Sequence, residues 1–146
     1  MRIAFASDHA AVALKATLAA HVRGLGHEVL DLGTNGDASV DYPDYGYALA
    51  EALADGRAER GIALCGSGIG IAIAANRHPA CRCAQVSEPL SATLARTHND
   101  ANAIAIGARL IGETMAIAIV DAFLTTEFEG GRHQHRVDKL SKEFTA

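Results

Sequence analysis

The sequence predicts an α/β fold, a three-layer α/β/α sandwich around a five-stranded parallel sheet. Two observations lead to this expectation. Short apolar runs alternate with longer segments rich in alanine and leucine along the whole chain. The short runs are apolar at nearly every position, which is typical of strands that helices cover on both faces. The expected architecture is therefore Rossmann-like, with helices as the crossovers between parallel strands.

The first half of the chain supplies two strands and two helices. Residues 2–7 (RIAFAS) form a short apolar run and predict the first strand, and residues 11–26 predict a helix that glycines end. Residues 27–32 (HEVLDL) predict the second strand. A polar loop follows, and the helix expected over 43–56 opens at a proline, which is favoured in a first helical turn.

The second half continues the alternation. Apolar runs predict strands over 61–65, 81–86 and 102–107. Helices are expected over 69–77, 88–99 and 113–128, and the glycines of EGG (129–131) precede a last, polar helix. In such sheets, ligands bind beyond the carboxyl ends of the strands, where the strand order switches. The residues directly after each strand are therefore the candidates for a site.

Composition narrows the class of protein. A chain of 146 residues, 49% hydrophobic and 21% charged, is expected to be one globular domain over residues 1–146. No apolar run approaches the ~18 residues that span a membrane, so no membrane partner is expected. A net charge of −4 argues against a nucleic-acid partner. Three cysteines and a polar N-terminus fit a cytoplasmic protein without disulfides.

The segment CGSGIG (65–70) joins the third strand to its helix. It is neither a dinucleotide fingerprint, whose third glycine comes one residue later, nor a P-loop, which needs Gly-Lys-Ser/Thr. Glycines allow backbone amides to approach a ligand closely, and a helix start adds partial positive charge. The segment thus predicts a pocket for negative charge, with Cys65 at its lip and Ser67 as a further donor. The alternative, equally weighted here, is a Cys65 buried as core.

Other polar residues have a structural interpretation beside a functional one. Asp8 and His9 follow the first strand, where an Asp also caps helices. His98 and Asn99 end a helix, where Asn is common. No set of His, Cys and carboxylates has the spacing of metal ligands, so neither a metal nor a cofactor is expected.

The last polar helix carries a local basic cluster. Residues 132–142 hold four Lys/Arg and two His against one Asp. Arg132 and Arg136 are four residues apart and would lie side by side on a helix. Two guanidinium groups on one face suit a phosphate, and a solvated helix face explains them equally well.

Seven blocks of sequence, spread over nearly the whole chain, resemble one family in its own order. They are SDHA (7–10), DYPDY (41–45), CGSGIGIAIAAN (65–76), SEP (87–89), THNDAN (97–102), GARLIG (107–112) and EGGRHQHRV (129–137). The family is ribose-5-phosphate isomerase type B, with the related galactose-6-phosphate isomerase subunits. The chain departs from the family at Ala11 and Val12, where the family usually has Gly and an aromatic residue near the substrate.

The resemblance implies a metal-free aldose–ketose isomerase that interconverts ribose 5-phosphate and ribulose 5-phosphate through an enediolate. Cys65 matches the base of family members that carry cysteine there. Ser67 and the amides of Gly66, Gly68 and Gly70 would then hold the developing oxyanion. A six-carbon aldose 6-phosphate is the alternative substrate.

The resemblance assigns the remaining residues to sugar and phosphate. His98 would open the sugar ring, and Asp8 would handle hydroxyl protons. Hydroxyl ligands would be Tyr42 and Asn99, and phosphate ligands would be His9, Arg109, Arg132 and Arg136, with His133 close by. The family also implies a homodimer, or a homotetramer built from it, with sites shared between chains. A sugar-phosphate-binding module without chemistry and a thiol-dependent hydrolase or redox protein are the competing classes.

Overall fold

A computed structural model describes residues 1–142 and contains the expected five-stranded parallel sheet. The strand order is β2-β1-β3-β5-β4, so the order switches direction between β1 and β3. The strands are β1 (Arg2–Ser7), β2 (Glu28–Asp31), β3 (Arg60–Cys65), β4 (Cys83–Gln85) and β5 (Ala103–Gly107). The α/β fold expected from the sequence is confirmed.

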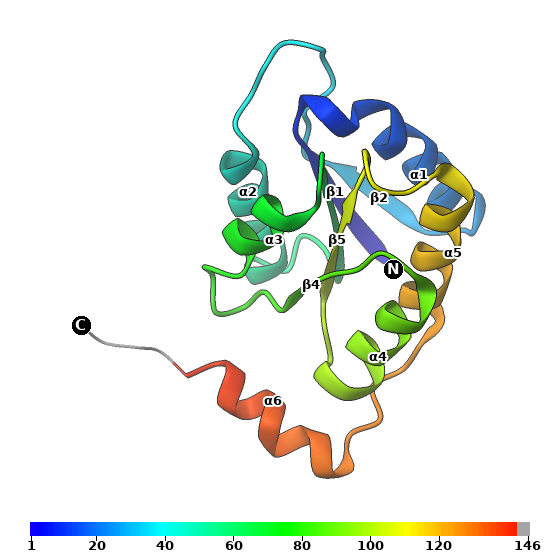
Figure 1. Cartoon of the computed structure of the whole chain (residues 1–146). Coiled ribbons are helices and arrows are strands. Elements are labelled where there is room, and N and C mark those ends of the chain that lie inside the picture. Colours follow the sequence, from blue (N-terminus) through cyan, green and yellow to red (C-terminus); the bar gives the residue numbers. More distant parts are fainter. Residues whose placement is uncertain (143–146) are drawn as a thin grey trace.

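Helices cover both faces of the sheet, as Figure 1 shows. Three helices pack on one face: α1 (Val12–Gly24), α4 (Pro89–Asn99) and α5 (Glu113–Thr125). Two pack on the other: α2 (Tyr42–Ala54) and α3 (Ile69–Ala75). The 3-10 turns η1 (His9–Ala11) and η2 (Gly131–His133) precede α1 and α6 (Gln134–Leu140), and α6 projects away from the sheet.

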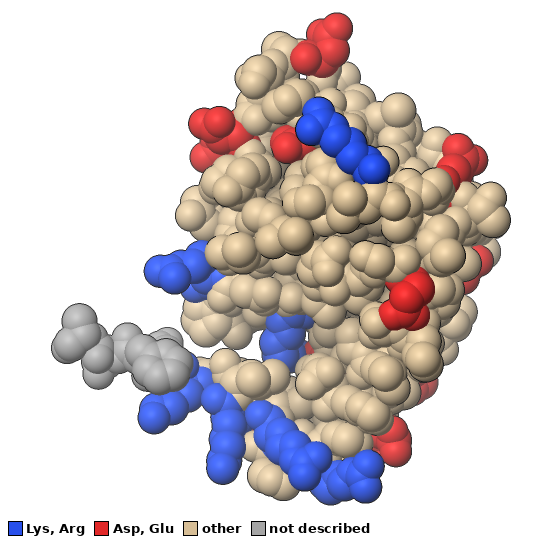
Figure 2. Space-filling model, in the orientation of Figure 1, with Lys and Arg blue, Asp and Glu red and all other residues tan. Residues whose placement is uncertain are grey.

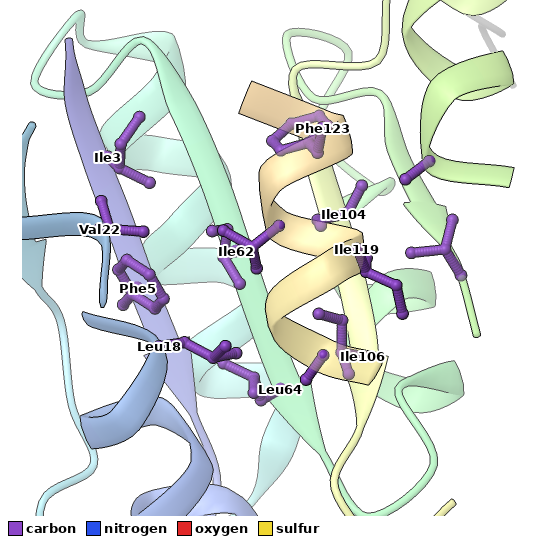
Figure 3. Close-up of a cluster of buried hydrophobic side chains, with 14 of the residues drawn as sticks. Ile3, Phe5, Leu18, Val22, Ile62, Leu64, Ile104, Ile106, Ile119 and Phe123 are labelled. Carbon is purple, nitrogen blue, oxygen red and sulfur yellow. The ribbon is translucent and has the colours of Figure 1, made fainter. Parts of the chain in front are cut away.

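The two faces of the sheet carry side chains of different size. Because side chains alternate along a strand, Ile62 and Leu64 of β3 point to the face of α1 and α5, in a core of isoleucine, leucine and phenylalanine (Figure 3). Ala63 and Cys65 point to the opposite face, where the strands present mostly alanine. Small side chains let the second layer lie close: a Cβ on Gly46 of α2 would come within 2.7 Å of the Ala74 Cβ.

Several boundaries differ from those expected. The strand expected over 81–86 covers only Cys83–Gln85, because β4 is an edge strand that pairs with β5 alone. The helix expected to reach residue 128 ends at Thr125, because the backbone of Thr126 is extended. The Thr125 and Thr126 hydroxyls donate hydrogen bonds to carbonyls one turn earlier in the helix. Within the described residues, no helix combines the length and apolar character needed to cross a bilayer.

A buried ion pair fixes the loop between β2 and α2. The Lys15 side chain, on α1, is 2% exposed, and its ammonium donates to Asp31 at 2.5 Å and to Asn35 at 2.7 Å. Farther along the loop, the Val40 amide donates to His9 Nδ1 at 3.1 Å. The loop is thereby held near its start by α1 and near its end by η1, which fixes where Tyr42 begins α2.

We expect Lys15→Met to destabilise the fold by about 2–3 kcal/mol. Removal of one partner of a fully buried pair typically costs ~3–5 kcal/mol, and the loss is smaller here because Asp31 remains 33% exposed. Urea denaturation at fixed protein concentration measures the difference. Lys139→Met, at an exposed position of α6, is the matched control and should stay within ~0.5 kcal/mol of the parent. Equal midpoints for both variants would contradict the role of the buried pair.

Candidate active site

The carboxyl ends of the central strands meet at one edge of the sheet. Cys65, the last residue of β3, pairs in register with Gly107, the last residue of β5. On its other side β3 pairs with β1, which ends at Ser7. The next residue, Asp8, therefore lies at the same edge and beside the switch in strand order, which is where open α/β sheets bind ligands.

A cavity of about 600 Å³ opens at this edge. It collects seven of the residues singled out from the sequence: Asp8, Tyr42, Cys65, Gly66, Ser67, Gly70 and Arg109. The side chains of Ile69, Ile73 and Leu110 also line it and are more than half exposed. The sequence did not single out these three. Buried Asp8 and Cys65 thus line its interior, and exposed apolar side chains lie beside exposed Tyr42 and Arg109 at its surface.

The glycine loop wraps around the Cys65 sulfur. Cys65 is 4% exposed, and the Gly68 amide donates a hydrogen bond to its Sγ at 3.1 Å. Gly68 has a φ of +76°, and a Cβ there would come within 2.8 Å of the Ile106 carbonyl carbon. Only glycine fits this position. The Gly68 amide expected to face an oxyanion is therefore directed at the sulfur in this structure.

The rest of the loop is held against β5 and α2. A Cβ on Gly107 would lie 2.6 Å from the backbone of Ser67, so the loop crosses the end of β5 in van der Waals contact. The Ser67 hydroxyl accepts from the Ile69 amide at 3.2 Å. At Gly70, a Cβ would lie 2.6 Å from the Tyr42 ring, which places the phenol directly over the start of α3.

A cation and a carboxylate face the same cavity. The Arg109 amide donates to the Gly66 carbonyl at 3.0 Å, and the Arg109 guanidinium lies against Gly66. Asp8 is 7% exposed and accepts from the Ala10 amide at 3.0 Å, so it caps η1 and lines the cavity at once. His9 accepts at Nδ1 from Val40, which leaves the proton of a neutral ring on Nε2 as a donor.

The remaining predicted residues form a second group. The His98 and His133 rings stack with centroids 4.4 Å apart and an interplanar angle of 16°. His98 Nε2 is 3.8 Å from a carboxylate oxygen of Glu129, a residue that the sequence analysis did not single out. Burial lowers the pKa of His133, and the neighbouring His98 and Arg132 lower it further.

Asn99 and the two arginines extend this second group. Asn99 lines a separate hollow of about 350 Å³, together with Arg82 and Leu140. Arg132 and Arg136 are exposed. In Figure 2, Lys and Arg side chains form a row along α6, on the part of the chain that projects from the sheet. This group is cationic and open to solvent.

The two groups lie at opposite ends of the strands: the cavity lies at the carboxyl ends, and His98 lies before the amino end of β5. Helix α4 runs back from the carboxyl edge, and His98 stands five residues before the start of β5 at Ala103, whereas Cys65 pairs with the end of β5. The five residues of β5 span roughly 13 Å at ~3.3 Å per residue. Figure 1 shows the end of α4 and all of α6 away from the loops that follow β3 and β5. One chain therefore does not bring Cys65 and His98 together.

The sequence missed Gly107 and Glu129 for different reasons. Gly107 ends an apolar strand, and Gly66 directly follows one. This similarity could have marked Gly107 as a candidate site residue from the sequence. Glu129 lies in a glycine-rich turn and contacts His98 only because the chain folds back beside α4. Nothing in the local sequence marks that contact.

One cavity at the switch point of the parallel sheet is lined by a thiol, a carboxylate, a phenol and a guanidinium. This combination defines an α/β enzyme that acts on a small polar substrate. The family described as Ribose/Galactose Isomerase matches residues 3–140. The chain belongs to this family, and it is an enzyme of the aldose–ketose isomerase class. The resemblance inferred from the sequence blocks is confirmed.

Individual relatives agree over nearly the whole chain. Ribose-5-phosphate isomerase B of Escherichia coli is 46% identical over 96% of this chain and 94% of its own. The structure of ribose-5-phosphate isomerase B from Clostridium thermocellum superposes with a TM-score of 0.95 at 47% identity, covering 97% of this chain and 95% of its own. D-erythrulose-4-phosphate isomerase of Pectobacterium atrosepticum is 42% identical, over 96% of this chain and 93% of its own.

We expect Gly107→Ala to lower isomerase turnover by at least ~10²-fold, because the new Cβ would displace the Ser67 backbone and a shift of about 1 Å in a site can cost that much. Gly24→Ala is the control, since nothing lies within 4 Å of its Cβ position. Thermal melting of both variants separates loss of loop geometry from loss of fold. A folded Gly107→Ala enzyme with parental turnover would show that the loop position does not matter.

Proposed function

We propose that this chain interconverts D-ribose 5-phosphate and D-ribulose 5-phosphate by proton transfer through an enediolate. The observation that carries the proposal is the Cys65 sulfur, held at the floor of the cavity by the Gly68 amide, with Ser67 and the start of α3 beside it. The E. coli and C. thermocellum relatives are named for the same reaction.

Cys65 is the base in this scheme. Its thiolate takes the proton from C2 of the open-chain aldose, which places negative charge on O1. The O2 hydroxyl proton then moves to O1, and the thiol returns its proton to C1 to give the ketose. The donors for that charge are the Ser67 hydroxyl and the amides of Gly66 and Gly70, because the Gly68 amide already binds the sulfur. Loss of one such donor typically costs ~3–4 kcal/mol of transition-state stabilisation.

The ring must open before this step, and His98 is the residue we assign to it. Because His98 lies at the opposite edge of the sheet from Cys65, the site is completed by a second copy of the chain. The exposed Ile69, Ile73 and Leu110 around the cavity supply an apolar surface for that copy. A two-fold dimer would then contain two equivalent sites. Whether two such dimers form a tetramer does not alter this arrangement.

The substrate ligands divide in the same way. Asp8, Tyr42, His9 and Arg109 come from the chain that supplies Cys65, and Asn99, Arg132, His133 and Arg136 come from the chain that supplies His98. Guanidinium groups from both chains then hold the phosphate, which suits their bidentate geometry. The three free cysteines fit a reducing compartment, and we place the enzyme in the cytoplasm.

A different sugar phosphate is the competing substrate. The family includes galactose isomerases, and the P. atrosepticum relative is named for a four-carbon ketose phosphate. Ala11 is buried in η1, two residues after His9 and three after Asp8, so a change of residue there bears on the sugar-binding end of the site. Assaying ribose 5-phosphate beside allose 6-phosphate and galactose 6-phosphate decides the preference by their kcat/KM ratio.

We expect Cys65→Ala to abolish formation of ribulose 5-phosphate while keeping the affinity for a sugar phosphate within several-fold, because the phosphate ligands lie elsewhere. Ketose formation and calorimetric binding measure the two effects. Cys81→Ala is the matched control: Cys81 is also buried, and its thiol, with a pKa that burial raises to about 12, lies outside the cavity. Parental turnover in Cys65→Ala would contradict the assignment of Cys65 as the base. A parent protein that binds the sugar phosphate but forms no ketose would favour a binding module.

Two inactive variants should restore activity to each other if each site takes Cys65 from one chain and His98 from its partner. In a mixed dimer of Cys65→Ala and His98→Asn chains, one site keeps both residues and the other loses both. Random mixing makes about half of the dimers mixed, so we expect about a quarter of the parental activity after joint refolding.

Each variant refolded alone is the control, and exchange of differently tagged chains confirms that mixing took place. No recovery despite exchange would place Cys65 and His98 of the same chain in one site. That result would require α4 and α6 to be rearranged relative to β3.

A further inference from the structure

Three potential metal ligands from separate segments meet in the second group. His98 lies in the last turn of α4, Glu129 lies in the turn after α5, and His133 ends η2. Each offers one ligand atom, and these atoms all lie within 4.8 Å of one another. The spacing of these residues in the sequence, with 30 positions between His98 and Glu129, is unlike that of the usual metal motifs, which is why the sequence predicted no site.

His133 supplies an independent indication of a ligand. The residue is 6% exposed, and its Nε2 is fully buried without a hydrogen-bond partner among the described residues. Buried polar atoms are normally paired, so an unpaired imidazole nitrogen calls for a partner that the chain itself does not provide.

We propose that His98, Glu129 and His133 form a site for a divalent transition-metal ion of the Zn²⁺ class. Two imidazole nitrogens and one carboxylate, with a fourth position left to solvent, are a ligand set that Zn²⁺ accepts. Ca²⁺ and Mg²⁺ prefer sets made of oxygen and are not expected to bind. The ion is not a cofactor of the isomerisation.

Coordination needs a contraction and a turn of at least one imidazole, because the ligand atoms lie within 4.8 Å of one another and the His98 and His133 rings are stacked with an interplanar angle of 16°. Ligand atoms around a tetrahedral Zn²⁺ are about 3.4 Å apart, and His98 Nε2 is now 3.8 Å from the Glu129 oxygen. His98 and Glu129 have side chains that are 40% and 60% exposed, so both can move toward the ion while buried His133 stays fixed. The nearby cationic Arg132 and Arg136 weaken the site, and the Glu129 carboxylate offsets part of that repulsion.

The consequence for the enzyme is inhibition. This step rests on the proposed function, in which His98 moves a proton during ring opening. A metal ion on the His98 ring occupies the lone pair that the proton needs, and it also blocks the phosphate end of the substrate near His133. The geometry thus links the concentration of free Zn²⁺ to turnover.

Direct binding tests the site without reference to activity. The Cys65→Ala protein is titrated with Co²⁺, whose visible absorption reports tetrahedral nitrogen and oxygen ligands, and Zn²⁺ is then added to displace it, in buffer free of phosphate. Removing Cys65 prevents its thiol from binding the same ions. Adding Glu129→Gln should weaken Zn²⁺ binding at least about tenfold, an effect of the size that lost metal-site partners produce. Glu127→Gln, an exposed change of equal charge two residues away, should leave binding unchanged.

Inhibition is then measured in the Cys65-containing enzyme. We expect Zn²⁺ to inhibit isomerisation, EDTA to reverse the effect, and Glu129→Gln alone to need at least about tenfold more Zn²⁺ for half-inhibition, measured against its own metal-free rate. Equal Zn²⁺ affinity in the Glu129→Gln and Glu127→Gln proteins would overturn the metal site. Binding that depends on Glu129 but does not inhibit would uphold the site and count instead against the proton-moving role of His98.

Discussion

The close contact between the glycine loop and the end of β5 is the constraint on which the cavity depends. Ser67 crosses Gly107 at a distance that excludes any side chain there, and Gly68 turns with a positive φ against Ile106. These two contacts aim the Gly68 amide at the Cys65 sulfur and start α3 directly above it. A buried thiol with a backbone donor follows from packing against a neighbouring strand, and no catalytic side chain is needed to hold it.

The unequal faces of the sheet explain where the loop can go. The face of α1 and α5 is filled by large side chains, whereas the face of α2 and α3 is lined by alanine. Only on the alanine face can two helices approach each other and the sheet closely enough for Tyr42 to cover Gly70. The same arrangement leaves Ile69 and Ile73 of α3 exposed beside the cavity, which is the surface that we assign to a second chain.

The row of cationic side chains on α6 and the three proposed metal ligands lie at the other end of the molecule. The turn after α5 brings Glu129 and His133 beside the end of α4, and α6 carries its arginines away from the sheet. In the proposed dimer this group faces the partner's cavity. In that dimer the site stays incomplete until two copies meet, and the partly exposed His98 stays accessible to an ion until the substrate binds.

The sequence by itself determined the α/β class, the order of strands and helices, and the family, because alternating apolar runs and the seven motif blocks are local features. It also marked Cys65 and the glycines around it, since a glycine-rich turn after a buried strand is visible in the sequence. Only the tertiary structure decided that Cys65 and His98 lie at opposite edges and that Glu129 joins the two histidines. The reason is physical: a helix of eleven residues returns the chain across the sheet, and the distance between two sites then depends on packing and not on spacing.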